Sequence, residues 1–478
     1  MFSIKQQRFR FRLLTLTIVG LLLVSCVYGV YSVSTYGNRW FSSAKNVRNQ
    51  SARGSVTKGN VIDRRGVILA STNRDGNRVY QRDLPSRKAI VHLIGDESGN
   101  IANGVDSFQS AYLLGFETSL TERVNSLLKG ETRRGDDVTL TVDSALCTDI
   151  VAAFEGSGAT RDKAGAAVVM NYKTGEVLAL VSLPVFDPAN VNDQVRADPL
   201  HPFWNRALQS ILPPGSTFKI ITAAAAIQNM ADATTHVYDC TGATKVLNRV
   251  VTDFARAQHG KITLERAFTV SCNNTFAQCA LLLGDATLRR TAESFGFNAN
   301  FLFRDFVVEN SLYPTRDRNA LEVAWSGAGQ SQVTATPLHM CMVAASIANR
   351  GIMMEPRLLG KVQSPAGMVR LRFSPKQYAQ ACSPSTAATL DGYMKNVVTK
   401  GSGAAAGVRG LTIAGKTGSA ESSIDGKPVT HAWFVGYIAD PALPYACSVL
   451  VESGGNGGTV AAPIAARIFR FLKDHYSR

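Results

Sequence analysis

The sequence predicts an α+β protein, with an antiparallel sheet flanked by helices, a smaller pedestal domain before it and one N-terminal transmembrane helix. Three observations lead to this expectation. The chain has an uncharged apolar run near its start, strand patterns at both ends of a long C-terminal segment, and Ala- and Leu-rich helical stretches between those strands. With 478 residues, of which 45% are hydrophobic and 18% charged, it has enough apolar material for a large core.

The first element is expected to be a transmembrane helix at residues 13–33, after a cytoplasmic tail at residues 1–12. The run from Leu13 to Val33 carries no charge, and about 20 apolar residues cross a bilayer as a helix. Positive charge before such a run is typical of the cytoplasmic side of a membrane. The basic residues here are Lys5, Arg8, Arg10 and Arg12.

Two other kinds of N-terminus remain open. A cleaved signal peptide would have a shorter apolar core. A lipid anchor on Cys26 is the other alternative, because Leu23-Val24-Ser25-Cys26 resembles a bacterial lipoprotein cleavage box. All three readings place the rest of the chain outside the cytoplasm, so the expected protein is a single-pass bacterial membrane protein with an extracytoplasmic catalytic part.

Residues 34–139 are expected to form a small pedestal domain. The stretch from Val61 to Ala70 follows a strand, turn, strand pattern, and one helical segment is expected near Ser119–Leu128. Residues 140–478 are expected to form the main domain. No internal repeat or low-complexity tract stands out in either part.

In the main domain, strands are expected at both ends and helices between them. Apolar runs at Ala166–Met170 and Val177–Val181 flank a turn and form a β-hairpin pattern. Asp425-Gly426 is a strong turn signal between two later strands. The C-terminal strands are expected at Leu411–Ala420, Thr430–Ile438 and Tyr445–Val451. Helices are expected at Lys219–Asn229, Leu264–Leu283, Pro337–Asn349 and Ala461–His475.

The composition favours an acidic envelope as the surroundings of this protein. The formal net charge is +15 and the pI is near 9.5, which indicates anionic partners. Beyond the N-terminal tail, however, the chain has no dense Lys/Arg run, no aromatic-basic RNA signature and no zinc-finger spacing. We therefore expect no nucleic-acid partner.

The eight cysteines predict neither a metal site nor a cofactor. None of them form Cys-x-x-Cys, and no pair of histidines has metal-ligand spacing. The cysteines are expected to be small buried side chains. No disulfide is assigned.

The first of three catalytic motifs is Ser-x-x-Lys at Ser216–Lys219. Pro213-Pro214-Gly215 stops the preceding element and an Ala-rich helical run follows, which places Ser216 at a helix N-terminus. Residues three apart share a helix face, so Lys219 can reach the Ser216 hydroxyl. A serine becomes a nucleophile when a neighbouring base takes its proton, and a lysine is such a base when its pKa is lowered. The same spacing after Ser42 and Ser55 lacks the turn and the helix, so no catalytic role is assigned there.

The second motif is Ser271-Cys272-Asn273, which falls between helical patterns at 264–270 and 275–283. A hydroxyl and an amide two residues apart can point into one cleft. Ser271 would relay a proton to the leaving amine, and Asn273 would hold the substrate backbone. Taken alone, a helix cap or a polar turn explains this triplet equally well.

The third motif is Lys416-Thr417-Gly418-Ser419, inside a strand pattern. Glycine within a strand often marks the close approach of a ligand or another backbone. Lys416 and Thr417 can bind a substrate carboxylate, and the Ser419 N–H can form an oxyanion hole with that of Ser216. A second Lys-Thr-Gly, at 173–175, lies in the expected hairpin turn and is assigned to that turn.

The order and spacing of these motifs resemble those of penicillin-binding proteins and serine β-lactamases. Further stretches resemble class B penicillin-binding proteins, which are monofunctional peptidoglycan D,D-transpeptidases. The likeness is strongest from about Gly165 onward. The stretches outside the motifs are Gly59–Gly66, His92–Gly95, Gly175–Leu180, Pro184–Pro188, Gly329-Gln330, Thr336–Leu338, Trp433–Gly436 and Ala461–Pro463.

The resemblance implies a transpeptidase fold of the penicillin-binding and serine β-lactamase type, and an acyl-enzyme mechanism. The substrate would be a peptidoglycan stem peptide ending in D-Ala-D-Ala, and β-lactams would acylate the same serine. The implied catalytic residues are Ser216 as nucleophile, Lys219 as its base, Ser271, Asn273 and Lys416, with Thr417, Gly418 and Ser419 binding substrate.

Two features depart from the usual pattern of that family. Cys272 takes the middle of the second triplet, where a small or aliphatic residue is commoner, so it is either a passive side chain or a thiol open to oxidation. The pedestal has no recognisable acidic glycosyltransferase motif, so a separate membrane glycosyltransferase is expected to polymerise the glycan.

Other functions use the same serine and stay as alternatives. A β-lactamase or D,D-carboxypeptidase would hydrolyse the acyl-enzyme, although a secreted hydrolase needs neither an anchor nor a pedestal. A β-lactam-sensing receptor would need substantial cytoplasmic or multi-pass machinery, whereas only residues 1–12 are expected in the cytoplasm.

Overall fold

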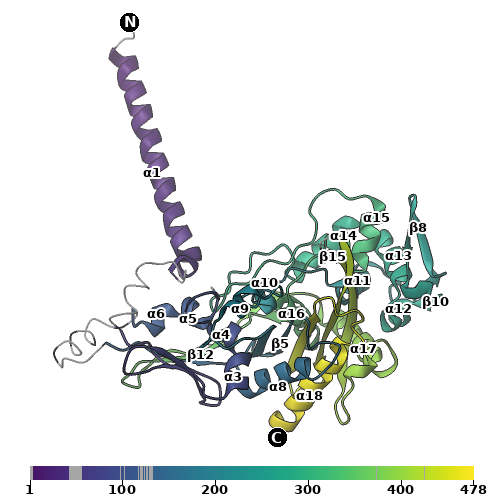
Figure 1. The fold of residues 1–478 in the computed structure, drawn as a ribbon. Coiled ribbons are helices and arrows are strands. Elements are labelled where there is room, and N and C mark those ends of the chain that lie inside the picture. The colour runs from purple at the N-terminus through teal and green to yellow at the C-terminus, as the bar shows by residue number, and fades with distance from the viewer. Residues whose placement is uncertain are drawn as a thin grey trace.

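The structure, a computed structural model, describes residues 4–41, 56–96, 98–101, 103–116, 133–372, 374–424 and 426–477, with single positions between 117 and 132. A long N-terminal helix extends away from a globular part that contains two larger sheets (Figure 1). Most of the helix expected at Ser119–Leu128 lies outside the described residues, as do Ser42 and Ser55.

Helix α1 (Ile4–Phe41) contains the apolar run at residues 13–33. Among the described residues, its segment 4–37 is long and apolar enough to cross a membrane, with a mean hydropathy of 2.3 and no buried residue in the apolar window. Large apolar side chains from Leu13 to Val33 are exposed all around the helix. Such a helix needs apolar surroundings, and a lipid bilayer supplies them. The expected N-terminal apolar helix is confirmed.

The N-terminal sheet has six strands in the order β13-β12-β4-β1-β2-β3. Four strands come from the expected pedestal: β1 (Val61–Ile62), β2 (Ile68–Thr72), β3 (Arg78–Tyr80) and β4 (Asp137–Leu140). The other two are β12 (Leu359–Gln363) and β13 (Val369–Arg372), and β12 pairs antiparallel with β4. Between β3 and β4 the chain forms the short helices α3 (Leu84–Ala89), α4 (Val91–Ile94), α5 (Val105–Phe108) and α6 (Ser110–Leu113).

This pairing bears on the division expected at residue 140. A boundary at 140 puts residues 359–372 in the main domain, yet their strands extend the N-terminal sheet. Strand order depends on contacts between residues far apart in sequence, which local patterns do not encode. The two parts of the chain therefore share this sheet, and the linear boundary at 140 stays a prediction.

The main sheet has five antiparallel strands in the order β15-β16-β17-β5-β6. Strand β17 pairs with β5 from Tyr445↔Asn171 to Val451↔Gly165, so strands from both ends of the segment meet as expected. All residues of β6 and β17 are buried, which is typical of strands covered on both faces. The bounds are β5 (Gly165–Asn171), β6 (Val177–Leu183), β15 (Ile413–Ile424), β16 (Lys427–Ile438) and β17 (Tyr445–Val451).

Helices pack against this sheet. Helices α8 (Ser144–Glu155) and α18 (Ala461–Tyr476) contact each other and cover one side, while α16 (Pro337–Ala348) contacts β5, β16 and β17 (Figure 1). Helix α16 is buried from Pro337 to Ile347, which explains why its sequence is apolar all round. The remaining α-helices in the described part of the chain are α9 (Asp193–Ala197), α10 (Arg206–Gln209), α11 (Lys219–Asn229), α12 (Leu264–Val270), α13 (Asn273–Leu283), α14 (Asp285–Ser294), α15 (Ala320–Gly327) and α17 (Pro384–Lys400).

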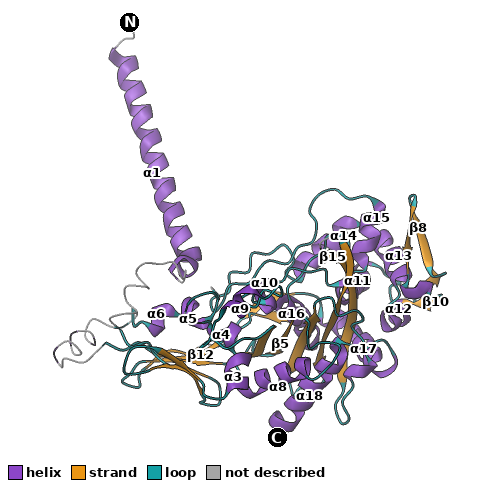
Figure 2. Cartoon of the chain, viewed as in Figure 1, coloured by secondary structure: helices purple, strands orange, loops and turns teal. Residues whose placement is uncertain are grey.

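Two small sheets lie at the rim of the molecule beside α12 and α13 (Figure 2). They pair β7 (Val237–Cys240) with β10 (Gly260–Thr263) and β8 (Ala243–Val246) with β9 (Arg249–Thr252). A third pairs β11 (Ile352–Met354) with β14 (Gln377–Gln380).

The fold class expected from the sequence is confirmed, and most expected elements lie within a few residues of their positions. Strands β15 and β16 are longer than expected, because Glu421–Ile424 pair with Lys427–Thr430 beyond the buried part of the sheet. Those residues are largely polar and exposed, so they carry no apolar alternation that would predict a strand.

Candidate active site

The Ser-x-x-Lys motif lies where a short 3-10 helix, η1 (Gly215–Phe218), runs into α11. Gly215 has a positive φ of 53°, and a Cβ there would lie 3.0 Å from the Cβ of Ala420 on β15. A glycine at this position therefore lets η1 approach the sheet closely. Ser216 is half-buried and Lys219 is fully buried, so the helical entry predicted from Pro213-Pro214-Gly215 is confirmed.

The Ser-x-Asn motif forms the junction between α12 and α13. Ser271 ends α12 in the left-handed conformation, with φ 63°. Cys272 is the N-cap of α13, and its sulfur accepts a hydrogen bond from the backbone N–H of Thr275. Helix α12 contacts both α11 and α17. The predicted stretch 264–283 is thus two helices, and the break at Ser271 turns two polar side chains toward α11.

The Lys-Thr-Gly motif lies on β15, the edge strand of the main sheet. A Cβ on Gly418 would lie 2.9 Å from the carbonyl oxygen of Pro214, so η1 crosses β15 at this glycine. Thr417 shares a 2.6 Å hydrogen bond with the hydroxyl of Ser402. The Ser419 hydroxyl accepts a hydrogen bond from the N–H of Gly457. The expectation that glycine in this strand allows another backbone to approach closely is therefore confirmed.

Both motif lysines converge on Ser271. The Nζ of Lys416 donates to Ser271 Oγ at 2.8 Å and to its own neighbour's carbonyl, that of Thr417, at 3.1 Å. The Nζ of Lys219 donates to the Ser271 carbonyl at 2.6 Å and lies 3.4 Å from Ser271 Oγ. It also donates to Asn273 Oδ1 at 2.8 Å. Four residues from three distant segments therefore form one polar network, beside the η1 segment that holds Ser216.

The environment of this network lowers the pKa of both amines. Burial lowers the pKa of Lys219 to about 8, against the opposing attraction of Cys272 and Asp253. Burial, and then repulsion from Lys219, hold the pKa of Lys416 well below its usual value. Two cations close to one hydroxyl repel each other strongly where water is excluded. A lysine that can lose its proton near neutral pH is able to act as a base.

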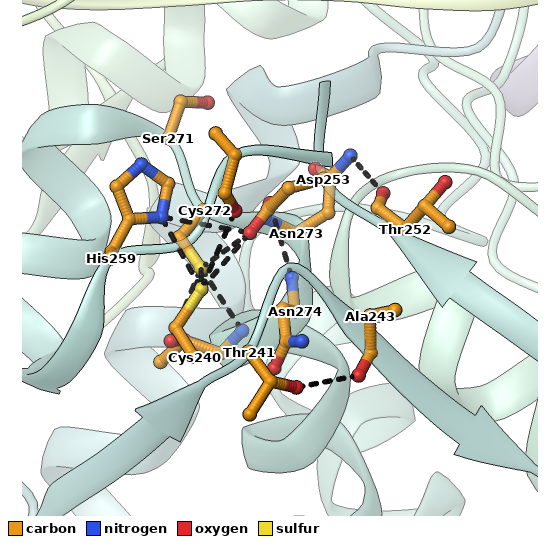
Figure 3. A network of polar contacts seen from close by, with 12 residues as sticks. Cys240, Thr241, Ala243, Thr252, Asp253, His259, Ser271, Cys272, Asn273 and Asn274 are labelled. Carbon is orange, nitrogen blue, oxygen red and sulfur yellow. Dashed lines mark hydrogen bonds and ion pairs between the residues drawn. The ribbon is translucent and has the colours of Figure 1, made fainter. Parts of the chain in front are cut away.

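Asp253 is a residue of this site that the sequence reasoning missed. Its Oδ1 accepts hydrogen bonds from the backbone N–H groups of Asn273 and Asn274, the latter at 3.2 Å. The side-chain amide of Asn273 donates to the Thr252 carbonyl at 3.2 Å. Asp253 therefore fixes the start of α13 (Figure 3). An acid at a helix N-terminus is a common stabilising feature, but no local signal connects Asp253 to a helix that begins twenty positions later.

The loop before α16 is a second contribution that the motifs did not reveal. Gly329 has a φ of 75°, and a Cβ there would lie 2.0 Å from the carbonyl oxygen of Gly215. Its own carbonyl accepts a hydrogen bond from the Gly215 N–H at 3.1 Å. Gly329 thus holds η1 in place through close backbone contact with Gly215. In the sequence, Gly329 stands out only because Gly329-Gln330 resembles a stretch of class B penicillin-binding proteins.

The second Lys-Thr-Gly, at 173–175, has no part in this network. It forms the turn between β5 and β6, where Asn171 Oδ1 accepts from the N–H groups of Lys173 and Thr174. Gly175 has a φ of 81°, which suits a glycine in a turn. The assignment of this triplet to a hairpin turn is confirmed.

Comparison with known proteins agrees with this arrangement. Residues 165–470 match the penicillin binding protein transpeptidase domain family. The peptidoglycan D,D-transpeptidase PbpA of Mycolicibacterium smegmatis is 34% identical over 440 residues, which cover 86% of this chain and 87% of that protein. PbpA of Mycobacterium tuberculosis is 31% identical over 447 residues, which cover 87% of this chain and 88% of that protein.

Solved structures show the same likeness. Penicillin-binding protein A from M. tuberculosis, as an imipenem acyl-enzyme complex, has a TM-score of 0.77 at 28% identity, covering 87% of this chain and 99% of that one. The D,D-transpeptidase domain of a peptidoglycan glycosyltransferase from Eggerthella lenta has a TM-score of 0.74 at 30% identity, covering 88% and 99%. The family match covers more than half of the chain, and the relatives match it along most of its length. The chain therefore belongs to the penicillin-binding protein transpeptidase family, among the class B penicillin-binding proteins.

Proposed function

We propose that this protein is a membrane-anchored peptidoglycan D,D-transpeptidase that works through an acyl-enzyme on Ser216. One observation carries the proposal: Lys219 and Lys416 both reach Ser271, and Lys219 follows the half-buried Ser216 by three positions. Burial of two lysine side chains costs free energy, and buried amines with a lowered pKa are typical of catalytic sites. The D,D-transpeptidase names of the relatives support the same function.

Lys219 is the base in the proposed acylation step. As a neutral amine it has two N–H donors, for the Ser271 carbonyl and Asn273 Oδ1, and one lone pair. Lys219 lies one helical turn after Ser216, so the lone pair is available to take the hydroxyl proton. Ser216 Oγ then forms a bond to the carbonyl carbon of the penultimate D-Ala. The backbone N–H groups of Ser216 and Ser419 are the proposed oxyanion donors.

The C–N bond to the terminal D-Ala breaks next, and its nitrogen needs a proton. Ser271 is the proposed relay, because its hydroxyl lies between the two lysines. Asn273 would hold the substrate backbone, and Lys416 with Thr417 and Gly418 would bind the terminal carboxylate on β15. An amine from a second stem peptide then attacks the acyl carbon and releases Ser216. β-Lactams would acylate Ser216 by the same first step.

The cellular arrangement follows from the same proposal. Helix α1 would anchor the protein in the cytoplasmic membrane, with residues 1–12 inside and the catalytic part outside, because basic residues precede the apolar run. An uncleaved helix is proposed over lipid attachment at Cys26. A separate membrane glycosyltransferase would supply the glycan strands that carry the stem peptides.

Labelling with a fluorescent penicillin tests the function. The full-length protein in detergent should form one covalent adduct that survives denaturing electrophoresis, and Ser216→Ala should form none while keeping its circular dichroism spectrum. Peptide mapping should place the adduct on Ser216. An adduct on another residue would contradict the assignment of the nucleophile.

The lifetime of the adduct separates the alternatives. A transpeptidase should hold the penicilloyl group for many minutes and release D-Ala from a stem pentapeptide when an acceptor amine is supplied. Rapid turnover of free penicillin would indicate a β-lactamase. Hydrolysis of the stem pentapeptide without transfer to the amine would indicate a D,D-carboxypeptidase. A stable adduct with no action on any stem peptide would favour a β-lactam-sensing receptor.

A further inference from the structure

Four side chains with metal-ligating atoms meet behind the second motif, at a place that the proposed mechanism does not use. Cys240 ends β7, Asp253 follows β9, His259 precedes β10, and Cys272 joins α12 to α13. Their sulfur, oxygen and nitrogen atoms all lie within 4.8 Å of one another. Figure 3 shows the two thiols, the imidazole and the carboxylate pointing toward one point.

Five of the six ligand–ligand separations lie within about 0.5 Å of those in a tetrahedral zinc site, and the sixth, from Cys272 Sγ to His259 Nδ1, is within 4.8 Å. Cys240 Sγ lies 3.3 Å from Cys272 Sγ, 3.2 Å from Asp253 Oδ2 and 3.3 Å from His259 Nδ1. Asp253 Oδ2 lies 3.1 Å from Cys272 Sγ and 3.6 Å from His259 Nδ1. Four ligands around Zn²⁺ at ordinary bond lengths stand about 3.4 to 3.8 Å apart. An expansion of a few tenths of an ångström would therefore admit the ion.

We propose that Cys240, Asp253, His259 and Cys272 bind one zinc ion, and that this ion holds the second catalytic motif in place. Two thiolates, an imidazole and a carboxylate are ligands that zinc prefers. Binding would release two protons, one from each thiol, to solvent. With all four positions filled by protein, the ion has no place for substrate or water, so its role is structural.

The surroundings of the cluster are those of a supported metal site. Cys240, Asp253 and Cys272 are buried, while the His259 side chain is 22% exposed and provides a way in for the ion. The second oxygen of Asp253 is held by the N–H groups of Asn273 and Asn274. Cys272 Sγ accepts from the N–H of Thr275 at 3.2 Å. Outer hydrogen bonds of this kind orient metal ligands in proteins.

The link to the active site is direct. Cys272 lies between Ser271 and Asn273, and Asp253 binds the backbone N–H of Asn273. The other two ligands come from the β7–β10 sheet at the rim. The ion would therefore tie that sheet to the α12–α13 junction. Without the ion, Ser271 and Asn273 lose one of the contacts that hold them in position. The Ser271 carbonyl and Asn273 Oδ1, which accept hydrogen bonds from Lys219, are then less well placed.

The same four residues explain why the sequence predicted no metal site. The ligands are single residues spaced along the chain from Cys240 to Cys272, with no Cys-x-x-Cys pair and no second histidine. Only the pairing of β7 with β10, Cys240 opposite Gly260, brings the first cysteine next to His259. Cys272, expected to be either passive or oxidisable, is here a ligand.

The test begins with the full-length protein purified in detergent under reducing conditions without chelator. Elemental analysis should find about one zinc per chain. Cys240→Ser should lose it, because a serine hydroxyl is a poor zinc ligand, and this residue touches no catalytic side chain. The matched control is Cys279→Ser, a buried cysteine on α13 outside the cluster, which should keep the metal.

A spectroscopic measurement covers the case in which Cys240→Ser fails to fold. Exchange of the wild-type metal for Co²⁺ should give the intense visible bands of a tetrahedral site with thiolate ligands. In a second preparation, purified without any reductant, alkylation under denaturing conditions should modify all eight cysteines. A wild-type protein without zinc and without the cobalt bands would overturn the proposal, and so would a Cys240–Cys272 disulfide in the protein as purified.

The effect on catalysis is measured separately. Asp253→Asn keeps an oxygen for the N–H groups of Asn273 and Asn274 but removes the ligand charge. Its rate of acylation by penicillin should fall about 10- to 100-fold, and added Zn²⁺ should restore part of it. The metal content does not depend on the proposed function, whereas the acylation rate does, so the two can fail independently. Full activity of a zinc-free Asp253→Asn protein would contradict the coupling to the active site.

Discussion

The Nζ of Lys416 donates a hydrogen bond of 2.8 Å to the hydroxyl of Ser271, although 145 positions separate the two residues. The second lysine of the site approaches the same hydroxyl to 3.4 Å. These contacts bring together residues of three motifs, each of which is short enough to occur by chance in a sequence. Burial in this network lowers the pKa of both amines, and repulsion from Lys219 lowers that of Lys416 further.

The pH dependence of acylation should follow Lys219. Its pKa is about 8, chiefly because burial disfavours the charged amine. Below pH 8 the amine is protonated and cannot accept the Ser216 proton, so the second-order rate constant for penicillin should rise between pH 6.5 and 9 and then level off. Stopped-flow or gel-based labelling across this range measures it. Lys219→Arg, charged throughout, should be at least ~100-fold slower, and a flat wild-type profile would contradict the role of Lys219 as base.

Removal of Lys416 should impair the reaction, whereas removal of Lys173 should not. Lys416→Ala deletes the donor to Ser271 Oγ, and we expect acylation to slow about 100-fold, the usual cost of one electrostatic contact in an active site. Lys173→Ala changes the same tripeptide in the β5–β6 turn, where the Nζ of Lys173 donates to the Pro441 carbonyl. Penicillin labelling of both variants compares them directly. Equal rates would mean that the β15 motif does not bind ligand.

Gly329→Ala should disturb the nucleophile without touching it. The new Cβ would lie 2.0 Å from the Gly215 carbonyl oxygen and 2.6 Å from Phe218 Cβ, at a φ of 75°. The segment η1 would have to shift, so we expect at least tenfold slower acylation and a loss of ~1–3 kcal/mol of stability. Thermal unfolding and labelling measure the two effects.

Gly392→Ala is the control for that experiment. Gly392 lies inside α17, and a Cβ there meets nothing within 4 Å. Alanine should stabilise the helix by ~0.5–1 kcal/mol and leave acylation unchanged. If both glycine variants had the same acylation rate as wild type, the clamp on η1 would have no catalytic consequence.

The N-terminal sheet should depend on the buried carboxylate of Asp106. Arg78 binds it through two nitrogens at 3.1 and 2.7 Å, and Lys58 lies at 3.2 Å. Burial by itself raises the pKa of Asp106, but the two cations outweigh it and hold that pKa below 3.8. Asp106→Asn removes the negative charge that the buried Arg78 and the partly buried Lys58 both contact, and it should cost about 3–5 kcal/mol. Thermal unfolding of the full chain in detergent measures the loss.

The sign of the pH effect follows from the lowered pKa. The stabilisation from Asp106 is fully present above the unfolded-state pKa near 3.8, and it is lost as the pH falls through the lower folded-state value. Acid unfolding of wild type should therefore be steeper than that of Asp106→Asn. Lys376→Gln, which breaks an ion pair with an exposed lysine, should change stability by less than about 1 kcal/mol. A similar loss in both variants would contradict the importance of burial.

The amino-acid sequence alone determined the parts of this protein whose signals are local. Pro213-Pro214-Gly215 before an Ala-rich run is enough to place Ser216 at a helix entry. Apolar alternation and turn residues located the five strands of the main sheet, and the uncharged run of residues 13–33 predicted α1. Each of these depends on the conformational preferences of neighbouring residues, which are readable within a short window.

Tertiary structure alone decided which of those parts meet. That Lys416 reaches Ser271, that Gly329 clamps Gly215, and that β12 extends the N-terminal sheet are long-range contacts with no local signature. The cluster of Cys240, Asp253, His259 and Cys272 is the clearest case, since no spacing among these four residues indicates a metal site in the sequence. The physical reason is that the conformational preferences of neighbouring residues determine local secondary structure. Burial of apolar side chains in the shared core determines which distant segments pack together.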